Sequence, residues 1–153
     1  MIDQVISTWQ IHNRINLYLL DALDEAHLSD VSASKGRTVG EQLAHIHNVR
    51  LMWLKASAPE LLVGIDKVEK GQQITKETLA VALEKSSNAI EQMLTVGFAQ
   101  NKIKGMKPYP MTFLGYMIAH ESHHRGQIMM SLKQAGHPVD KKVQFGLWEW
   151  GTR

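Results

Sequence analysis

Apolar residues recur at three- and four-residue spacing in the first part of the chain. Between about residues 2 and 25 this spacing places on one face the apolar side chains of Ile2, Val5, Ile6, Trp9, Ile15, Leu19, Leu20 and Leu23. The pattern predicts an amphipathic helix. Asn13 and Asn16 lie on the same stripe, where a continuous core would have aliphatic residues, so they either hydrogen-bond within the core or line a polar pocket.

A second helix is predicted to begin near Val39. Thr38 and Glu41 have the spacing of a reciprocal capping pair, in which each side chain accepts from the other residue's backbone amide. The helix runs through GEQLAHIHNVRLMWLKA and ends before Pro59, since proline cannot continue it. From Ser57 to about Gln73 we expect a long connection, with a helical turn at residues 60–62.

Two further helices follow this connection. The third helix ends near Gly97, and its solvated face is rich in Lys and Glu. Its buried face is formed by Leu79, Leu83, Ile90, Met93 and Leu94. After the turn GMKPYP, a fourth helix is predicted from about Met111 to Ala135, closed by Gly136 and Pro138. The aromatic tail VQFGLWEWGTR is too short for its own core and should pack against the bundle or a partner.

These elements predict an all-α fold, a four-helix bundle with a long crossover connection, in a single domain spanning residues 1–153. No segment has a convincing strand pattern. A hydrophobic content of 44% and a charged content of 21% are close to globular averages, which favours an ordered chain.

Charge and cysteine content narrow the function. The formal net charge of +2 is scattered, without a basic stripe, so we expect no nucleic-acid partner. The absence of cysteine excludes a disulfide framework, a Cys-ligated zinc and a cysteine nucleophile. No targeting segment and no apolar run of membrane-spanning length is evident, so we expect a cytoplasmic protein without a membrane partner.

The segment HESHHRGQ on the fourth predicted helix carries the most informative chemistry. His120 and His124 are four residues apart, which differ by only about 40° around a helix, so both imidazoles project from one face at a spacing suited to one ion. His123 cannot share that geometry. The pair lies on the inward stripe formed by Phe113, Met117, His120, His124, Ile128 and Ser131.

A third imidazole is available on the second helix. His45 and His47 point about 200° apart, so only one of them can face the same centre, and spacing alone leaves both open. Three neutral imidazoles leave one or more metal positions free for water or substrate, as in catalytic sites. Imidazole ligands suit zinc, nickel, copper or ferrous iron.

A competing motif occupies the same segment. His120, Glu121 and His124 satisfy H-E-x-x-H, the zinc-protease motif in which the glutamate is the general base. The extended pattern requires a glycine where Gln127 stands and a histidine where Met130 stands, and the predicted fold lacks strands to hold a peptide. A zinc protease is therefore the less favoured alternative.

The order of these features resembles the DinB/YfiT-like family of proposed metalloenzymes over nearly the whole chain. The resemblance rests on a Trp-containing first helix, TVGEQLAHIHNVRLMWL on the second and AHESHHRGQIMMSLKQAG on the fourth. In that family a histidine before an aliphatic residue joins an H-x-x-x-H pair that precedes R-G-Q. This analogy selects His45, which precedes Ile46, as the third metal ligand with His120 and His124.

The resemblance implies a four-helix bundle with a three-histidine metal site, often as a homodimer, with zinc or nickel as the expected ion. It further implies a metal-dependent enzyme for a small-molecule substrate, either a hydrolase or a transferase that uses a low-molecular-weight thiol such as bacillithiol, glutathione or mycothiol. The alternative from a different class is a metal-binding stress-response module without turnover.

Several polar residues near the histidines are weaker candidates. Glu121 lies about 100° around the helix from His120, so it is a weak candidate for a catalytic base or a supporting contact, and a solvated surface position is the favoured expectation. Pocket or supporting contacts are assigned to Asn13, Asn16 and Gln42. Arg125 and Gln127 either bridge helices or the dimer, or are surface residues.

Overall fold

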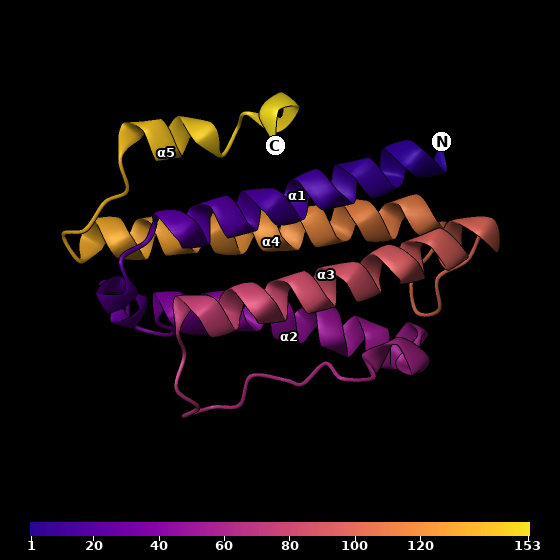
Figure 1. The fold of residues 1–153 in the computed structure, drawn as a ribbon, viewed down its shortest axis with the longest axis horizontal. Helices are drawn as coiled ribbons and strands as arrows, with labels where there is room; N and C mark the ends of the chain where they lie inside the picture. Colours follow the sequence, from indigo (N-terminus) through magenta and orange to yellow (C-terminus); the bar gives the residue numbers. More distant parts are fainter.

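In the computed structural model, which describes residues 1–153, four long helices dominate the chain (Figure 1). They are α1 (Ile2–Ala22), α2 (Val39–Ser57), α3 (Lys76–Ala99) and α4 (Pro110–Gln134). Shorter elements are η1 (Glu25–Ser29), η2 (Pro59–Leu62), α5 (Lys141–Gly146) and η3 (Trp150–Thr152). The predicted all-α fold is confirmed: the only extended pairing is an isolated bridge between Ile103 and Met106. None of the helices combines the length and apolar character needed to span a membrane.

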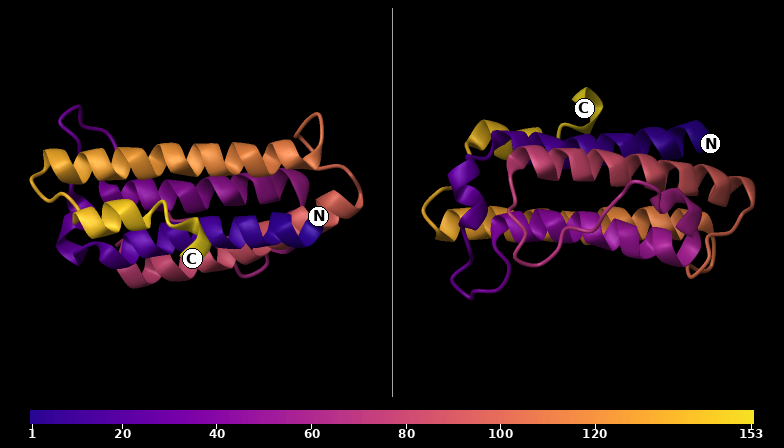
Figure 2. Two further views of the ribbon diagram at one scale, coloured as in Figure 1. Left: turned by 90° about the horizontal axis from the view of Figure 1, so that it is seen from above. Right: turned by 60° about the horizontal axis from the view of Figure 1, so that its bottom comes forward.

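The four helices form a bundle in which α1 and α4 lie side by side, as do α2 and α3 (Figures 1 and 2). Contacts also join α1 to α3 and α2 to α4, which closes the ring of neighbours. Helices α2 and α3 run in the same direction, so the chain returns along the bundle between η2 and α3 (Figure 1). This return is the predicted crossover connection, and η2 is its predicted helical turn.

Side-chain caps set the helix boundaries. At the start of α2, the Thr38 hydroxyl accepts from the Glu41 amide and the Glu41 carboxylate accepts from the Thr38 amide, as predicted. The first helix ends at Ala22, earlier than the predicted residue 25, because Asp24 accepts from the Ala26 amide and starts η1 instead. An aspartate at an N-cap favours a new helix start over continuation of the old one.

The core has two apolar parts separated by a layer of polar residues. One part surrounds Trp9 and Phe113, and the other surrounds Leu43 and Ile128. The layer between them, called the polar belt below, consists of buried residues from all four long helices: His12, Asn13, Asn16, Arg50, Ser86, Ser87, Glu121 and Arg125. Asn13 and Asn16 therefore hydrogen-bond within the core, one of the two expected alternatives.

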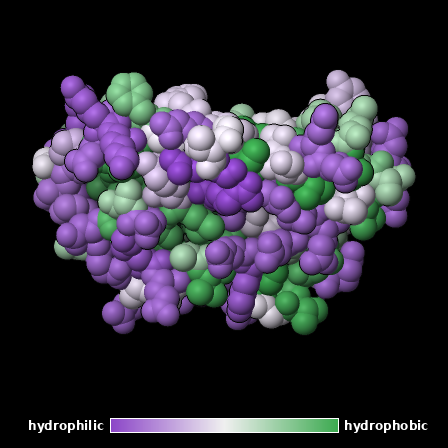
Figure 3. All heavy atoms as spheres, turned by 45° about the horizontal axis from the view of Figure 1, so that its top comes forward, coloured by the Kyte–Doolittle hydropathy of each residue, from purple (hydrophilic) through white to green (hydrophobic).

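The C-terminal segment packs on the bundle, as expected for the aromatic tail, with α5 beside α1 and α4 (Figure 2). The Arg153 guanidinium lies over the Tyr18 ring at 3.7 Å, and Trp150 approaches His12 with ring centroids 6.2 Å apart. Trp148 remains 81% exposed. On the face that carries α1 and α5, hydrophobic residues form several separate groups among hydrophilic ones (Figure 3).

Replacing Gly97 by alanine should destabilise the fold. A Cβ at this helical position would lie 2.5 Å from Cγ1 of Ile103, so the loop after α3 would have to move. We expect the free energy of unfolding, measured by urea denaturation, to fall by about 1–3 kcal/mol. The matched control is Gly115→Ala in α4, where a Cβ meets nothing within 4 Å and should stabilise the helix by about 0.5–1 kcal/mol. Equal effects of the two substitutions would contradict the packing argument.

Candidate metal centre

Neighbouring helices α2 and α4 bring three imidazoles together. His45 projects from α2 toward His120 and His124 on α4, and one ring nitrogen of each lies within 4.8 Å of the others. The ring centroid of His45 is 4.6 Å from that of His124 and 5.5 Å from that of His120. His124 is buried, whereas His45 and His120 are half-buried, so the cluster lies at the edge of the core with one side toward solvent.

Gln42, one turn before His45, orients the cluster. Its Oε1 accepts a hydrogen bond from Nδ1 of His124 at 2.7 Å. Because this nitrogen carries the proton, Nε2 of His124 presents a lone pair, which accepts from Nε2 of His120 at 3.2 Å when no ion is bound. Gln42 thus contacts one of the three clustered imidazoles directly, and its supporting role stays a prediction.

The spacing of these nitrogens suits a metal ion. Two imidazole nitrogens bound to one tetrahedral zinc at about 2.0–2.1 Å are separated by roughly 3.3 Å, close to the 3.2 Å between Nε2 of His120 and of His124. No carboxylate belongs to the group, and three imidazole ligands would leave at least one coordination position of a bound ion open. The residues present therefore fit a divalent ion with an exchangeable ligand.

The surroundings keep the imidazoles neutral. Burial, together with the nearby imidazoles of His120 and His45, lowers the pKa of His124 to about 4. Burial also lowers the pKa of His45 and of His120, and the positive charge of Arg37 acts in the same direction on all three. A neutral imidazole is the form that binds metal, so the cluster is prepared for an ion at neutral pH.

The metal-free protein should lose stability in acid through His124. Its unfolded form takes up a proton near the ordinary pKa of 6.5, whereas the folded form does so only near pH 4. The unfolded state thus binds more protons in that window, and the free energy of unfolding falls as the pH decreases through it. Denaturation in chelator at about pH 7.5 and about pH 5 should show a smaller acid loss for His124→Gln than for the wild type. Equal losses would contradict the assignment.

The other histidines of the four long helices lie elsewhere. Nε2 of His47 bonds to the backbone oxygen of Asp66 at 2.8 Å, on the side of α2 that faces the crossover connection. His12 faces Glu121, and His123 is exposed. The group therefore contains three histidines, without the fourth protein ligand that a closed structural site would need.

A second group of possible ligands, His27, Asp30 and His137, joins η1 to the end of α4. The rings of His27 and His137 stack with centroids 3.8 Å apart and an interplanar angle of 8°. An imidazole binds an ion in its own ring plane, so two parallel stacked rings do not converge on one metal. His137 instead donates from Nδ1 to Asp30 at 2.7 Å, which fastens the two segments together.

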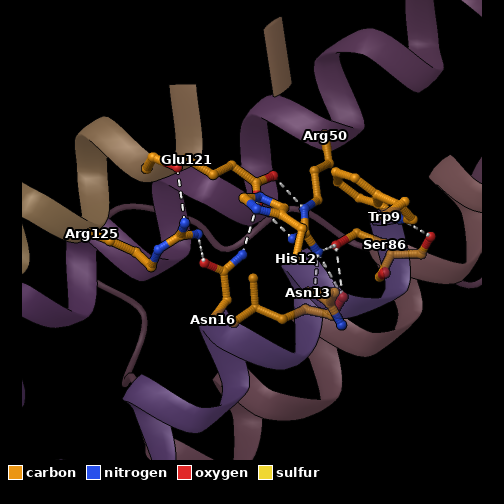
Figure 4. Close-up of polar contacts among 11 residues, drawn as sticks. Trp9, His12, Asn13, Asn16, Arg50, Ser86, Glu121 and Arg125 are labelled. Atoms are coloured by element: carbon orange, nitrogen blue, oxygen red, sulfur yellow. Dashed lines mark hydrogen bonds and ion pairs between the residues drawn. The ribbon is translucent and has the colours of Figure 1, made fainter. Parts of the chain in front are cut away.

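Glu121 is fully buried, which corrects the expected solvated position. Its carboxylate accepts from Nε and Nη2 of Arg50 at 2.7 and 2.8 Å, and from His12 at 2.8 Å (Figure 4). Burial alone would raise the pKa of Glu121, but the charge and hydrogen bonds of Arg50 hold it well below its usual range. Burial lowers the pKa of His12, so His12 donates to the carboxylate as a neutral imidazole.

The remaining polar candidates extend this buried arrangement. Asn16 donates to Glu121 at 2.7 Å and accepts from Arg125 at 2.6 Å, while Asn13 accepts from Arg50 at 2.9 Å (Figure 4). Arg125 thus bridges α4 to α1. Gln127 is exposed and its side chain makes no hydrogen bond, so it is a surface residue in this chain.

Sequence reasoning missed the roles of Arg50 and His12. Arg50 also bonds to the Leu83 oxygen and stacks over Trp9 with its guanidinium 4.9 Å from the ring centroid. The sequence does place the Arg50 cation and the His12 imidazole on otherwise apolar helix stripes, and that placement was the available signal of a buried polar role. Because Glu121 is engaged by these residues, it is not free to act as the general base that the zinc-protease alternative requires.

Comparison with known proteins agrees with this fold. An uncharacterized protein of Bacillus subtilis (strain 168), YrdA, is 23% identical over 144 residues, which cover 90% of this chain and 85% of that protein. A crystal structure of a DinB-like protein from Bacillus cereus ATCC 10987 matches with a TM-score of 0.65 at 22% identity, over 90% of this chain and 95% of that one. The DinB-like protein YjoA from Bacillus subtilis matches with a TM-score of 0.62 at 20% identity, over 90% and 96%.

At these identities the two crystal structures establish a shared fold. The family model of the DinB family matches residues 1–143, which include all four long helices and the three clustered histidines. The chain therefore belongs to the DinB family.

Proposed function

We propose that this chain binds one divalent metal ion, zinc or nickel, through His45, His120 and His124, and that it is a metal-dependent enzyme acting on a small molecule. The observation that carries the proposal is the short distance of 3.2 Å between the imidazole nitrogens Nε2 of His120 and His124. A ring nitrogen of His45 lies within 4.8 Å of the nitrogens of this pair. Bound there, such an ion acts as a Lewis acid and lowers the pKa of a water molecule or thiol that it binds.

The protein's own residues have defined tasks in this proposal. Gln42 holds His124 in the tautomer whose Nε2 is free to bind the ion. Tyr116 lies nearly parallel to His120 beside the cluster, with ring centroids 6.0 Å apart. Glu121 takes no direct part, because Arg50 and His12 occupy its carboxylate. The protein thus supplies ligands and orientation, and no carboxylate base belongs to the cluster.

The proposed reaction is transfer with a low-molecular-weight thiol as co-substrate, or hydrolysis with water as the nucleophile. Support comes from the open coordination position and from the family resemblance. A non-catalytic metal-binding module is the second candidate, favoured by the lack of a free carboxylate base beside the histidines. The three-ligand set supports the catalytic proposal more strongly, because structural zinc sites are usually closed by four protein ligands.

Metal uptake tests the first part of the proposal. Protein purified without a histidine tag should bind one zinc or nickel ion per chain by calorimetry and elemental analysis. The exposed imidazole of His123 gives a matched control, since His123→Ala should bind the ion as the wild type does. Failure of the wild type to take up either metal would overturn the proposal.

Turnover tests the second part. The metal-loaded protein would be screened for conjugation of glutathione, bacillithiol and mycothiol to electrophiles, and for hydrolysis of small esters and amides, each with and without chelator. We expect at least one activity that chelator abolishes. Tight metal binding without any such activity would favour the non-catalytic module.

The family resemblance also leads us to propose a homodimer. Light scattering coupled to size-exclusion chromatography should give twice the chain mass of 17.3 kDa. A monomeric mass across the concentration range would contradict this.

A further inference from the structure

A cavity of about 990 Å³ opens beside the metal centre. Its walls are the first half of α2, the segment before α2 and the crossover connection before α3. His45 and Arg37 both line it, so one of the three clustered imidazoles faces the same space as this arginine. The volume is at the upper end of typical small-molecule sites.

The acidic side chains of this cavity are already engaged. Glu25 accepts from the Lys76 amide at the start of α3 at 3.1 Å, and Glu41 accepts from the Thr38 amide at 2.8 Å. Glu69 lies 3.5 Å from the Lys67 ammonium. Each carboxylate of the cavity therefore has a partner within the protein.

Two cations of the same cavity have no such partner. Arg37 and Lys70 are exposed, and neither forms a side-chain hydrogen bond or an ion pair. Arg37 lies close enough to the cluster for its charge to act on His45, His120 and His124. The donors of Arg37 are thus free to bind a ligand in the space that His45 also lines.

We propose that Arg37, assisted by Lys70, binds the carboxylate of a small-molecule substrate or co-substrate whose other end reaches the three-histidine centre. This inference rests on the proposed metal-dependent function. A divalent ion held by three neutral imidazoles adds further positive charge without a protein carboxylate to balance it, which favours an anionic ligand.

Guanidinium geometry suits a carboxylate, because its planar donors match the two oxygens in a paired hydrogen bond. Phosphate would match the same donors. The three carboxylates that also line the cavity, from Glu25, Glu41 and Glu69, repel a doubly charged phosphate more than a singly charged carboxylate. The carboxylate is therefore the better fit.

The test compares two thiol probes on cobalt-loaded protein. The probes, 3-mercaptopropionate and the neutral 3-mercapto-1-propanol, differ in the carboxylate alone, and binding of either thiol to cobalt is read from the thiolate-to-cobalt absorption band. In the wild type we expect 3-mercaptopropionate to bind about threefold to tenfold more tightly, with a preference that weakens in high salt.

The variants assign the preference to its residues. In Arg37→Gln the preference for 3-mercaptopropionate over the neutral thiol should disappear, and in Lys70→Gln it should weaken. The matched control is Lys85→Gln, which removes an exposed cation on α3 outside the cavity and should keep the full preference.

The outcomes separate the two proposals. Cobalt uptake with equal affinity for both probes, or with no thiol band for either, overturns the carboxylate site and leaves the metal site standing. A preference that persists in Arg37→Gln overturns it as well. If the wild type takes up no cobalt, the proposed metal function fails, and the carboxylate site fails with it.

Discussion

Replacing Arg50 by methionine should lower the free energy of unfolding by about 3–5 kcal/mol, the cost of leaving one member of a buried ion pair without its partner. Arg50 and Glu121 are both inaccessible to solvent and share two hydrogen bonds of 2.7 and 2.8 Å. Loss of the guanidinium also leaves Asn13 Oδ1 and the Leu83 oxygen without this donor. Urea denaturation at neutral pH measures the effect.

A second substitution shows whether the effect comes from the pair. In Arg50→Met combined with Glu121→Leu no unpaired charge remains at the pair, so the double variant should be less destabilised than the sum of the two single variants. Arg37→Met, at an exposed arginine without a partner, is the matched control and should change stability by no more than about 0.5 kcal/mol. Strict additivity of the two single effects would contradict the coupling.

Removing any one of the three clustered histidines should weaken metal binding by more than about 100-fold. Loss of a residue that only hydrogen-bonds to a metal ligand typically weakens binding by about 10- to 100-fold, and loss of the ligand itself should cost more. The variants are His45→Ala, His120→Ala and His124→Ala. Each removes one of the three nitrogens that converge within 4.8 Å. Calorimetric titration with zinc and with nickel measures the affinity of each variant.

Thermal unfolding gives an independent measurement of the same effect. A ligand that binds only the folded state stabilises it by about 2.7 kcal/mol at 100 times its dissociation constant, so added zinc should raise the Tm of the wild type and of His123→Ala. The three ligand variants should show little increase at the same zinc concentration. A full increase in His124→Ala, whose imidazole is the most buried of the three, would argue against the centre.

Much of the fold was predictable from local signals. The capping pair of Thr38 and Glu41 fixes the start of α2, and Gly136, with its φ of 87°, follows the end of α4 as predicted. These signals act within a few residues and do not depend on the rest of the chain. The same locality explains the error at the end of α1, where the apolar stripe continues past Ala22 although the Asp24 cap starts a new helical segment.

The candidate site was only partly predictable. The spacing of His120 and His124 places them on one face of a helix, whatever that helix packs against. Helical spacing did not decide whether His45 or His47 is the third ligand, and the family resemblance selected His45. The structure brings His45 to the pair and turns His47 toward Asp66, although the binding of a metal there remains a prediction.

By itself, the sequence determined the four helices, the capping pair that starts α2 and the histidine pair one turn apart, because helical geometry relates residues close in the chain. Only the tertiary structure decided that α2 lies against α4 with His45 facing the pair, and that Glu121 is directed into the polar belt toward Arg50 and His12. These outcomes depend on which helices are neighbours and on how each is rotated about its axis. Packing of the whole bundle sets both, and no spacing within one helix contains them.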